Sequence, residues 1–221
     1  LHAKVEQEER SLTPEQRIHI EQLHQLNQNQ SELDTAYPGN ICVQDTAFIG
    51  NILNIGEVYQ HTFIDSYSKV VLAHLYLKKD VDSSIDMLKK HVIPWFVEKN
   101  ITIEQLLTDK GAEFYGKSHG GEKFQALLKS LHIEHIKMRA YNSPEVNGIC
   151  ARFHTQQKSG FYDTLLRTTS FNNLIELEAA LQQWLVEYNE KTPHQERYCF
   201  GKTPIATLHD SMHLINEFAQ P

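Results

Sequence analysis

The sequence lacks any long apolar run, and this absence limits where the protein can act. No stretch of about 18 consecutive apolar residues is present, so no segment predicts a membrane-spanning helix. The N-terminus also lacks the basic stretch, apolar stretch and small-residue cleavage site of a secretory signal peptide. We therefore expect a cytoplasmic protein that does not act in a membrane.

Cysteine is scarce, and its spacing argues against two kinds of cross-link. The three cysteines, Cys42, Cys150 and Cys199, form neither a C-x-x-C pair nor the Cys and His spacing of a zinc site. Their odd number also leaves one residue over in any set of disulfides. We interpret all three as reduced side chains that pack in the protein.

Positive charge is also in short supply. The chain has 21 Lys and Arg against 28 Asp and Glu, which gives a formal net charge of −7. Because binding to phosphates needs clustered Lys and Arg, this balance argues against a protein that coats nucleic acid with a basic surface. It does not exclude metal-dependent phosphoryl transfer, since such a site is itself acidic and a separate domain can capture the DNA.

What is present fits one main domain with shorter segments at its ends. The chain has 221 residues, of which 40% are hydrophobic and 22% charged. We expect an N-terminal linker over residues 1–36 that includes a helix at 13–29, a core over residues 37–210 and a tail over 211–221. Since position 1 is Leu and opens into a charged segment, we expect the chain to be part of a longer protein.

The core alternates strand-like and helix-like patterns. Short β-branched and aromatic runs predict strands at 41–45, 58–64, 70–77, 103–108 and 133–138. Apolar residues at helical spacing predict helices at 81–98, 122–131, 153–166 and 172–189, and residues 141–148 are expected to form a loop. The order predicts an α/β protein, in which helices flank a mixed five-stranded sheet. An RNase-H-like fold has this order, although the pattern alone would not select it.

Two aspartates follow predicted strands. Asp45 closes the first strand, and Asp109 closes the fourth before the turn that contains Gly111. Carboxylates at neighbouring strand ends can bind Mg²⁺, a hard cation that takes oxygen ligands. By spacing alone, each Asp could equally cap a turn.

Four segments resemble, in the right order, motifs of retroviral integrases and bacterial insertion-sequence transposases. TDKGAEF at residues 108–114 is similar to the family's T-D-N-G-x-E-F, with Lys110 in place of Asn. QDT at 44–46 with FIDSYSK at 63–69 resembles the first catalytic Asp and the following strand. SPEVNGICARFH at 143–154 resembles S-P-x-x-N-G-x-x-E-R-F-H, and YNEKTPH with GKTP at 188–204 resembles the Y-N-x-x-R-P-H and G-x-T-P tail.

The resemblance implies an RNase-H-like catalytic core of the DDE type, and one of its three carboxylates is missing. Asp45 and Asp109 match the two metal-binding aspartates, whereas Ala151 occupies the position of the catalytic Glu. The family uses Mg²⁺ or Mn²⁺ in a two-metal site, so the second metal would be weakly held here. Because loss of a charged metal ligand costs several powers of ten in rate, we expect this chain to be inactive or nearly so.

Other residues near these motifs are weaker candidates. Glu145 could replace the missing ligand if the loop that carries it is mobile, although a solvated carboxylate is the simpler interpretation. Glu113 matches a family position without a metal role, and His154 is expected to orient its helix or to pack beneath the site. Gly148 is expected to serve as a hinge before the helix. The candidate DNA-binding residues are Lys137, Arg139, Asn147, Arg152 and Lys158.

The resemblance also implies partners and leaves two rival functions. We expect the core to cleave DNA at transposon ends and join them to target DNA, in a homodimer or larger assembly associated with the bacterial nucleoid. In the first rival hypothesis, the chain is an inactive core that serves as a DNA-binding or dimerisation module. In the second, it is an RNase-H-like nuclease that cleaves without joining.

Overall fold

The computed structural model describes residues 33–115, 121–137 and 144–218, without the side chains of residues 137 and 144–147. The helix expected at residues 13–29 lies outside these ranges. No helix within them combines the length and the apolar character needed to cross a bilayer.

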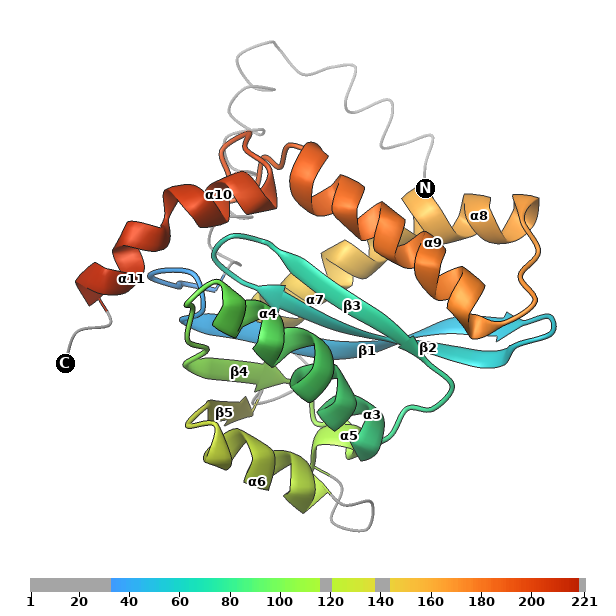
Figure 1. Cartoon of the computed structure of the whole chain (residues 1–221), viewed down its shortest axis with the longest axis horizontal. Helices are drawn as coiled ribbons and strands as arrows, with labels where there is room; N and C mark the ends of the chain where they lie inside the picture. The colour runs from blue at the N-terminus through green and yellow to red at the C-terminus, as the bar shows by residue number, and fades with distance from the viewer. Residues whose placement is uncertain (1–32, 116–120, 138–143, 219–221) are drawn as a thin grey trace, which may run out of the picture.

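A mixed five-stranded sheet forms the centre of the molecule (Figure 1). Its strands are β1 (Ile41–Ile52), β2 (Gly56–Asp65), β3 (Val71–Tyr76), β4 (Gln105–Thr108) and β5 (Glu134–Lys137). Their order across the sheet is β3-β2-β1-β4-β5. The first three strands are antiparallel neighbours, and β4 and β5 are added parallel to β1. The predicted mixed sheet with flanking helices is confirmed.

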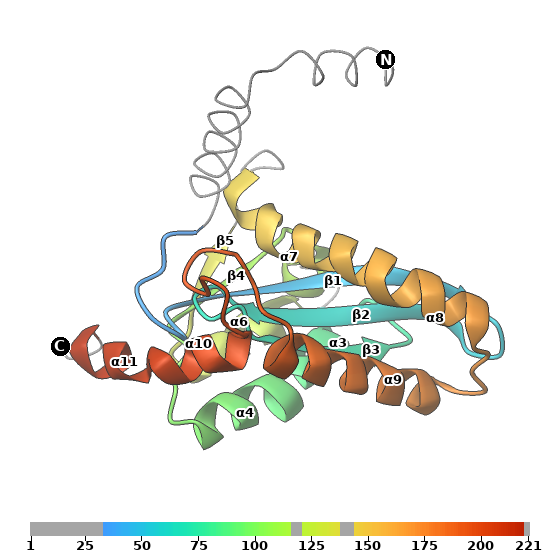
Figure 2. The same cartoon turned by 90° about the horizontal axis from the view of Figure 1, so that it is seen from above.

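Helices cover both faces of this sheet, as Figures 1 and 2 show together. One face packs against α3 (Val81–Asp86), the π-helical segment η1 (Met87–Val92), α4 (Ile93–Glu98) and α6 (Gly121–Ser130). The other packs against α7 (Pro144–Gln157), η3 (Lys158–Tyr162), α8 (Asp163–Thr168), α9 (Leu174–Val186) and η4 (Glu187–Lys191). The remaining helices are α5 (Ala112–Tyr115), α10 (Pro204–Asp210) and α11 (Met212–Phe218), the last of which lies in the predicted tail.

Two hydrophobic cores result from the alternation of side chains along the strands. Cys42 and Leu106 face the core beneath α4 and α6, whereas Val43 and Leu107 face the core beneath α7. Odd-numbered residues of β4 and of β1 before its register shift at Phe48 therefore lie on the α7 side of the sheet. This parity determines which side chains can meet α7.

Two predicted boundaries are wrong. β1 does not end at Asp45, because its antiparallel pairing with β2 continues to the pair Ile52 and Gly56. Likewise, α7 begins at Pro144 rather than at residue 153, which is compatible with proline in a first helical turn. Gly148 thus lies inside the helix and is not a hinge. A Cβ there would lie 2.9 Å from Nη1 of Arg152, so glycine leaves room for that guanidinium.

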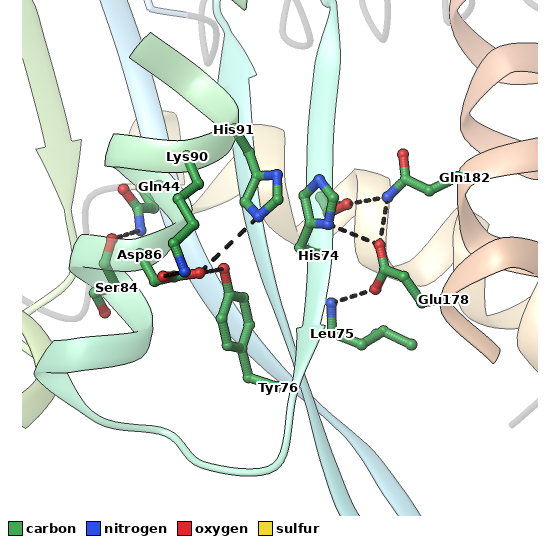
Figure 3. A network of polar contacts seen from close by, with 11 residues as sticks. Gln44, His74, Leu75, Tyr76, Ser84, Asp86, Lys90, His91, Glu178 and Gln182 are labelled. Atoms are coloured by element: carbon green, nitrogen blue, oxygen red, sulfur yellow. Dashed lines mark hydrogen bonds and ion pairs between the residues drawn. The ribbon is translucent and has the colours of Figure 1, made fainter. Parts of the chain in front are cut away.

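Side chains of α9 and η4 cover the outer edge of β3, and Figure 3 shows those of α9. Asn189 accepts a hydrogen bond from the Val71 N–H at 2.9 Å and donates to the Val71 carbonyl at 2.8 Å. Glu178 accepts from the N–H of Leu75 at 2.7 Å, and Gln182 donates to the Ala73 carbonyl at 2.8 Å. These bonds satisfy backbone groups that an edge strand would otherwise leave open to pairing with another chain.

Candidate active site

Asp45 and Asp109 lie directly after the last paired residues of two neighbouring parallel strands. The parallel pairing of β1 with β4 ends at Gln44 opposite Thr108, so each aspartate is the next residue of its chain. Each is two residues beyond a side chain that faces α7, Val43 in one case and Leu107 in the other. Because side chains alternate along an extended chain, Asp45 and Asp109 face the same side. Since neighbouring strands lie about 4.8 Å apart, the two carboxylates project from nearby points on the same face.

The electrostatics of this pair reflect burial and mutual repulsion. Burial raises the pKa of Asp109, and the negative charge of Asp45 raises it further. The backbone N–H of Gly111 opposes this shift by donating to Oδ1 of Asp109 at 2.9 Å. Asp45 keeps a side chain that is 29% exposed, and its Oδ1 accepts from the N–H of Thr46 at 2.8 Å.

A third carboxylate and a lysine complete the surroundings of Asp109. Glu113, 2% exposed, forms an ion pair with Lys79 at 3.1 Å between Oε1 and Nζ. Burial lowers the pKa of Lys79, but the charges of Glu113, Asp109 and Asp45 outweigh burial and raise it overall. Gly111 permits this crowding, because a Cβ there would clash with both Glu113 and Asp109. No sequence motif pointed to Lys79, which follows β3 in a polar stretch.

One turn of α7 faces the aspartates. The Cys150 thiol is buried, which raises its pKa, and the charges of Asp45 and Asp109 add to the effect. His154 lies with Nδ1 at 3.7 Å from Oδ2 of Asp45, and burial lowers its pKa against the opposing charge of Asp45. Ala151 is exposed and stands three residues before His154, so both lie on the same side of the helix.

These donors fit one hard cation better than two. Two carboxylates on one face, with like charges that raise the pKa of Asp109, form an oxygen donor set suited to Mg²⁺ or Mn²⁺. Within the described ranges, no three His, Cys, Asp or Glu side chains form a set that could hold a metal ion. The methyl group of Ala151 supplies no donor where α7 meets the pair.

Two further carboxylates, Glu145 and Asp65, lie near the motifs of this site. Position 145 is in the first turn of α7 and not in a loop, about 9 Å along the helix axis from position 151. The Glu145 side chain lies outside the described residues. Asp65 is two residues beyond Phe63 on β2, so its side chain lies on the opposite face of the sheet from α7. There it accepts hydrogen bonds from the backbone N–H groups of Gly39 and Ser68.

The structure describes the candidate DNA-binding residues unevenly. Arg139 lies outside the described residues. Lys137 ends β5 and Asn147 lies in α7, but neither side chain is described. Arg152 is half-buried on α7, and Lys158 is exposed at the start of η3. Among the candidates whose side chains are described, Lys158 is therefore the exposed one, next to the end of α7.

A second polar cluster lies apart from the aspartates, on the far side of β3. A cavity of about 310 Å³ there is lined by residues of β3, η1, α4, α9, η4 and α10, none of them from the acidic site. The rings of His74 and His91 stack at 3.4 Å between centroids, and His74 Nδ1 lies 2.7 Å from Oε1 of Glu178 (Figure 3). This cluster joins η1 and α9 across the edge strand.

Comparison with known proteins finds similarity to integrases in sequence and in fold. Residues 132–196 match the integrase core domain family. The ORF3 protein of Spiroplasma virus SpV1-C74, whose name describes it provisionally as an integrase, is 26% identical over 146 residues. That match covers 63% of this chain and 39% of the viral protein.

Solved structures show the same fold. The chain from an intasome of simian T-cell lymphotropic virus, determined with the PP2A regulatory subunit B56 gamma, gives a TM-score of 0.63 at 18% identity, over 80% of this chain and 57% of that one. The HTLV-2 integrase catalytic core in complex with magnesium gives 0.59 at 18% identity, over 80% and 100%. The BIV integrase catalytic core gives 0.54 at 20% identity, over 79% and 97%. The chain thus has the RNase-H-like fold seen in retroviral integrase catalytic cores, and its residues 132–196 match the integrase core domain family.

Proposed function

We propose that this chain is the catalytic core of a DDE-type polynucleotidyl transferase, which cleaves DNA at the ends of a mobile element and joins them to target DNA. We further propose that Ala151 leaves this form inactive or nearly so. The observation that carries the proposal is that Asp45 and Asp109 directly follow the last residues of the β1–β4 pairing, on the face of the sheet that packs against α7.

Each residue of the site has a distinct part in this proposal. Asp45 and Asp109 would hold a divalent cation, as the magnesium complex of the HTLV-2 core suggests by analogy. When bound, the cation activates a water or 3′-hydroxyl and stabilises the leaving oxygen of a phosphodiester. Lys79 reduces the net negative charge around Asp109, because it forms an ion pair with Glu113. The Ala151 methyl cannot contribute the charge that a second cation requires.

The test restores the missing carboxylate. Ala151→Glu is expected to raise nicking and strand transfer with Mg²⁺ or Mn²⁺ by several powers of ten over the unmodified chain. Ala151→Gln is the matched control, because it adds nearly the same volume without the charge. Robust activity of the unmodified chain, or equal inactivity of the Glu and Gln variants, would contradict the proposal.

Ala151 also favours a second candidate function. A core without its third carboxylate could act as a module that binds DNA or dimerises. DNA binding by every variant, with no chemistry even from Ala151→Glu, would favour that function. Cleavage without joining of ends would instead indicate a nuclease. In each case we propose DNA as the partner and a homodimer or larger assembly as the active form.

A further inference from the structure

A chain of buried polar side chains leads from Asp45 into the core between β2 and α7. His154 contacts Asp45 through Nδ1, and its other ring nitrogen, Nε2, lies 2.9 Å from Oγ1 of Thr62. Thr62 is fully buried on β2, directly opposite Asp45 in the antiparallel register. Both nitrogens of the imidazole therefore have a polar neighbour, one acidic and one neutral.

The chain continues beyond Thr62 to residues that the reaction itself does not use. Nε2 of the buried Gln60 lies 2.8 Å from Oγ1 of Thr62 and 2.8 Å from Oε1 of Gln157. The hydroxyl of Tyr162 donates to Oε1 of Gln60 at 2.6 Å. Three elements, β2, α7 and η3, thus contribute to one hydrogen-bonded series that ends at His154, whose other ring nitrogen contacts Asp45 on β1.

One arrangement of the hydrogens accounts for each contact of this series from Tyr162 to His154. Tyr162 has a single hydroxyl hydrogen, which the carbonyl oxygen of Gln60 accepts. The amide of Gln60 then directs its two N–H groups to Thr62 and Gln157. Thr62 accepts one of them and keeps its own hydroxyl hydrogen for Nε2 of His154. A neutral imidazole has one N–H, so that N–H is on Nδ1 and faces Asp45.

The reverse direction is less favourable at both ends. Turning the Gln60 amide over would leave the hydroxyl hydrogen of Tyr162 without its acceptor in a buried site, which costs free energy. It would also place the N–H of His154 on Nε2 and turn the Nδ1 lone pair toward the carboxylate of Asp45. The charge of Asp45 and the hydroxyl of Tyr162 therefore select the same arrangement from opposite ends.

We propose that His154 is a positioning residue for Asp45, with its Nδ1–H held toward the carboxylate by the series from Tyr162 through Gln60 and Thr62. The proposal rests on the proposed function, in which Asp45 binds the cation. At 3.7 Å the contact is longer than a hydrogen bond, so the N–H acts as an oriented dipole. It favours the orientation of Asp45 that faces Asp109 and α7, as outer-shell partners do for metal ligands.

The first test reads the ring directly and needs neither metal nor DNA. Long-range ¹H–¹⁵N correlation spectra distinguish the two neutral tautomers of histidine, at a pH well above its ordinary pKa of about 6.5. The His154 signals are assigned by their loss in His154→Gln. We expect the Nδ1–H tautomer in the unmodified chain. A ring protonated on Nε2 would overturn the proposal.

The second test asks whether the donor matters for the cation. His154→Asn keeps an amide N–H close to the Nδ1 position, whereas His154→Leu fills the space without a donor. By calorimetric titration with Mn²⁺, we expect the Leu variant to bind about tenfold more weakly and the Asn variant to bind nearly as the unmodified chain does. Gln156→Ala, at the exposed neighbour of His154 on α7, is the control and should not change the affinity.

The two tests separate the possible failures. Urea midpoints of all variants show whether each one is folded. A folded Leu variant with unchanged Mn²⁺ affinity, or an Asn variant as weak as Leu, would overturn the positioning role. If the unmodified chain itself binds no Mn²⁺, the proposed function fails, and the tautomer of His154 alone decides this proposal.

Discussion

At the scale of single residues, the acidic site stores an electrostatic cost in the folded protein. Burial and the neighbouring charge of Asp45 both raise the pKa of Asp109, so its ionised form is less favourable in the folded state than in the unfolded state. Lys79 reduces this cost but forms its ion pair with Glu113 rather than with Asp109. A cation that binds between the two aspartates would therefore stabilise the folded state.

This cost predicts a pH-dependent effect of Asp109→Asn. A raised folded-state pKa means that the contribution of Asp109 is most favourable below its unfolded pKa and is lost as the pH rises through the folded value. The Asn variant should therefore be more stable than the unmodified chain at pH 7 in the absence of metal. The difference should disappear near pH 4, close to the unfolded pKa of about 3.9, as Asp109 becomes protonated.

Urea unfolding at several pH values measures this difference. Asp163→Asn, at an exposed carboxylate on α8, is the control for loss of one negative charge. An Asn variant of Asp109 that is less stable than the unmodified chain at pH 7 would show that the hydrogen bond from Gly111 outweighs burial and repulsion.

At the scale of elements, part of the family-like sequence pattern serves the fold rather than the chemistry. Tyr188 and Asn189 begin the segment that resembles the Y-N-x-x-R-P-H motif. Asn189 bonds to both backbone groups of Val71 on the edge strand, while Tyr188 packs edge-on against Phe153 of α7. The motif therefore attaches η4 to the sheet and supports the helix that carries Ala151.

Asn189→Ala should consequently destabilise the fold. It removes two hydrogen bonds and leaves the N–H and carbonyl of the buried Val71 without partners. We expect a loss of about 1–3 kcal/mol in the free energy of unfolding, with faster hydrogen exchange at the Val71 amide. Asn189→Asp keeps the acceptor for the Val71 N–H and should cost less. An Ala variant as stable as Gln183→Ala, at an exposed position of α9, would contradict this role.

At the scale of the whole molecule, the missing carboxylate should change how many cations the core holds. The two aspartates come from the sheet, and the third position comes from α7, which packs across it. We expect calorimetric titration to give one Mn²⁺ per unmodified chain and two per Ala151→Glu chain, because the second site needs a charge from the helix. The double variant Asp45→Asn, Asp109→Asn should bind none. Two equivalents bound by the unmodified chain would show that another residue replaces the missing Glu.

The sequence by itself determined the chemistry that the site can offer. The period of its apolar residues predicted the order of strands and helices, since side-chain alternation and helical spacing are local properties. The ordered motifs identified Asp45, Asp109 and Ala151 as the three positions of interest. Helix boundaries were less accurate, and the start of α7 at Pro144 was missed because helix N-terminal signals also occur in loops.

Only the tertiary structure decided which side chains meet. The parallel register of β1 with β4 sets Asp45 beside Asp109, although 63 residues separate them in the chain. Packing of α7 on the sheet brings His154 to Asp45 and Thr62, and the turn after β3 brings Lys79 to Glu113. These contacts depend on strand pairing and helix packing between distant segments, and local sequence preference carries no information about them.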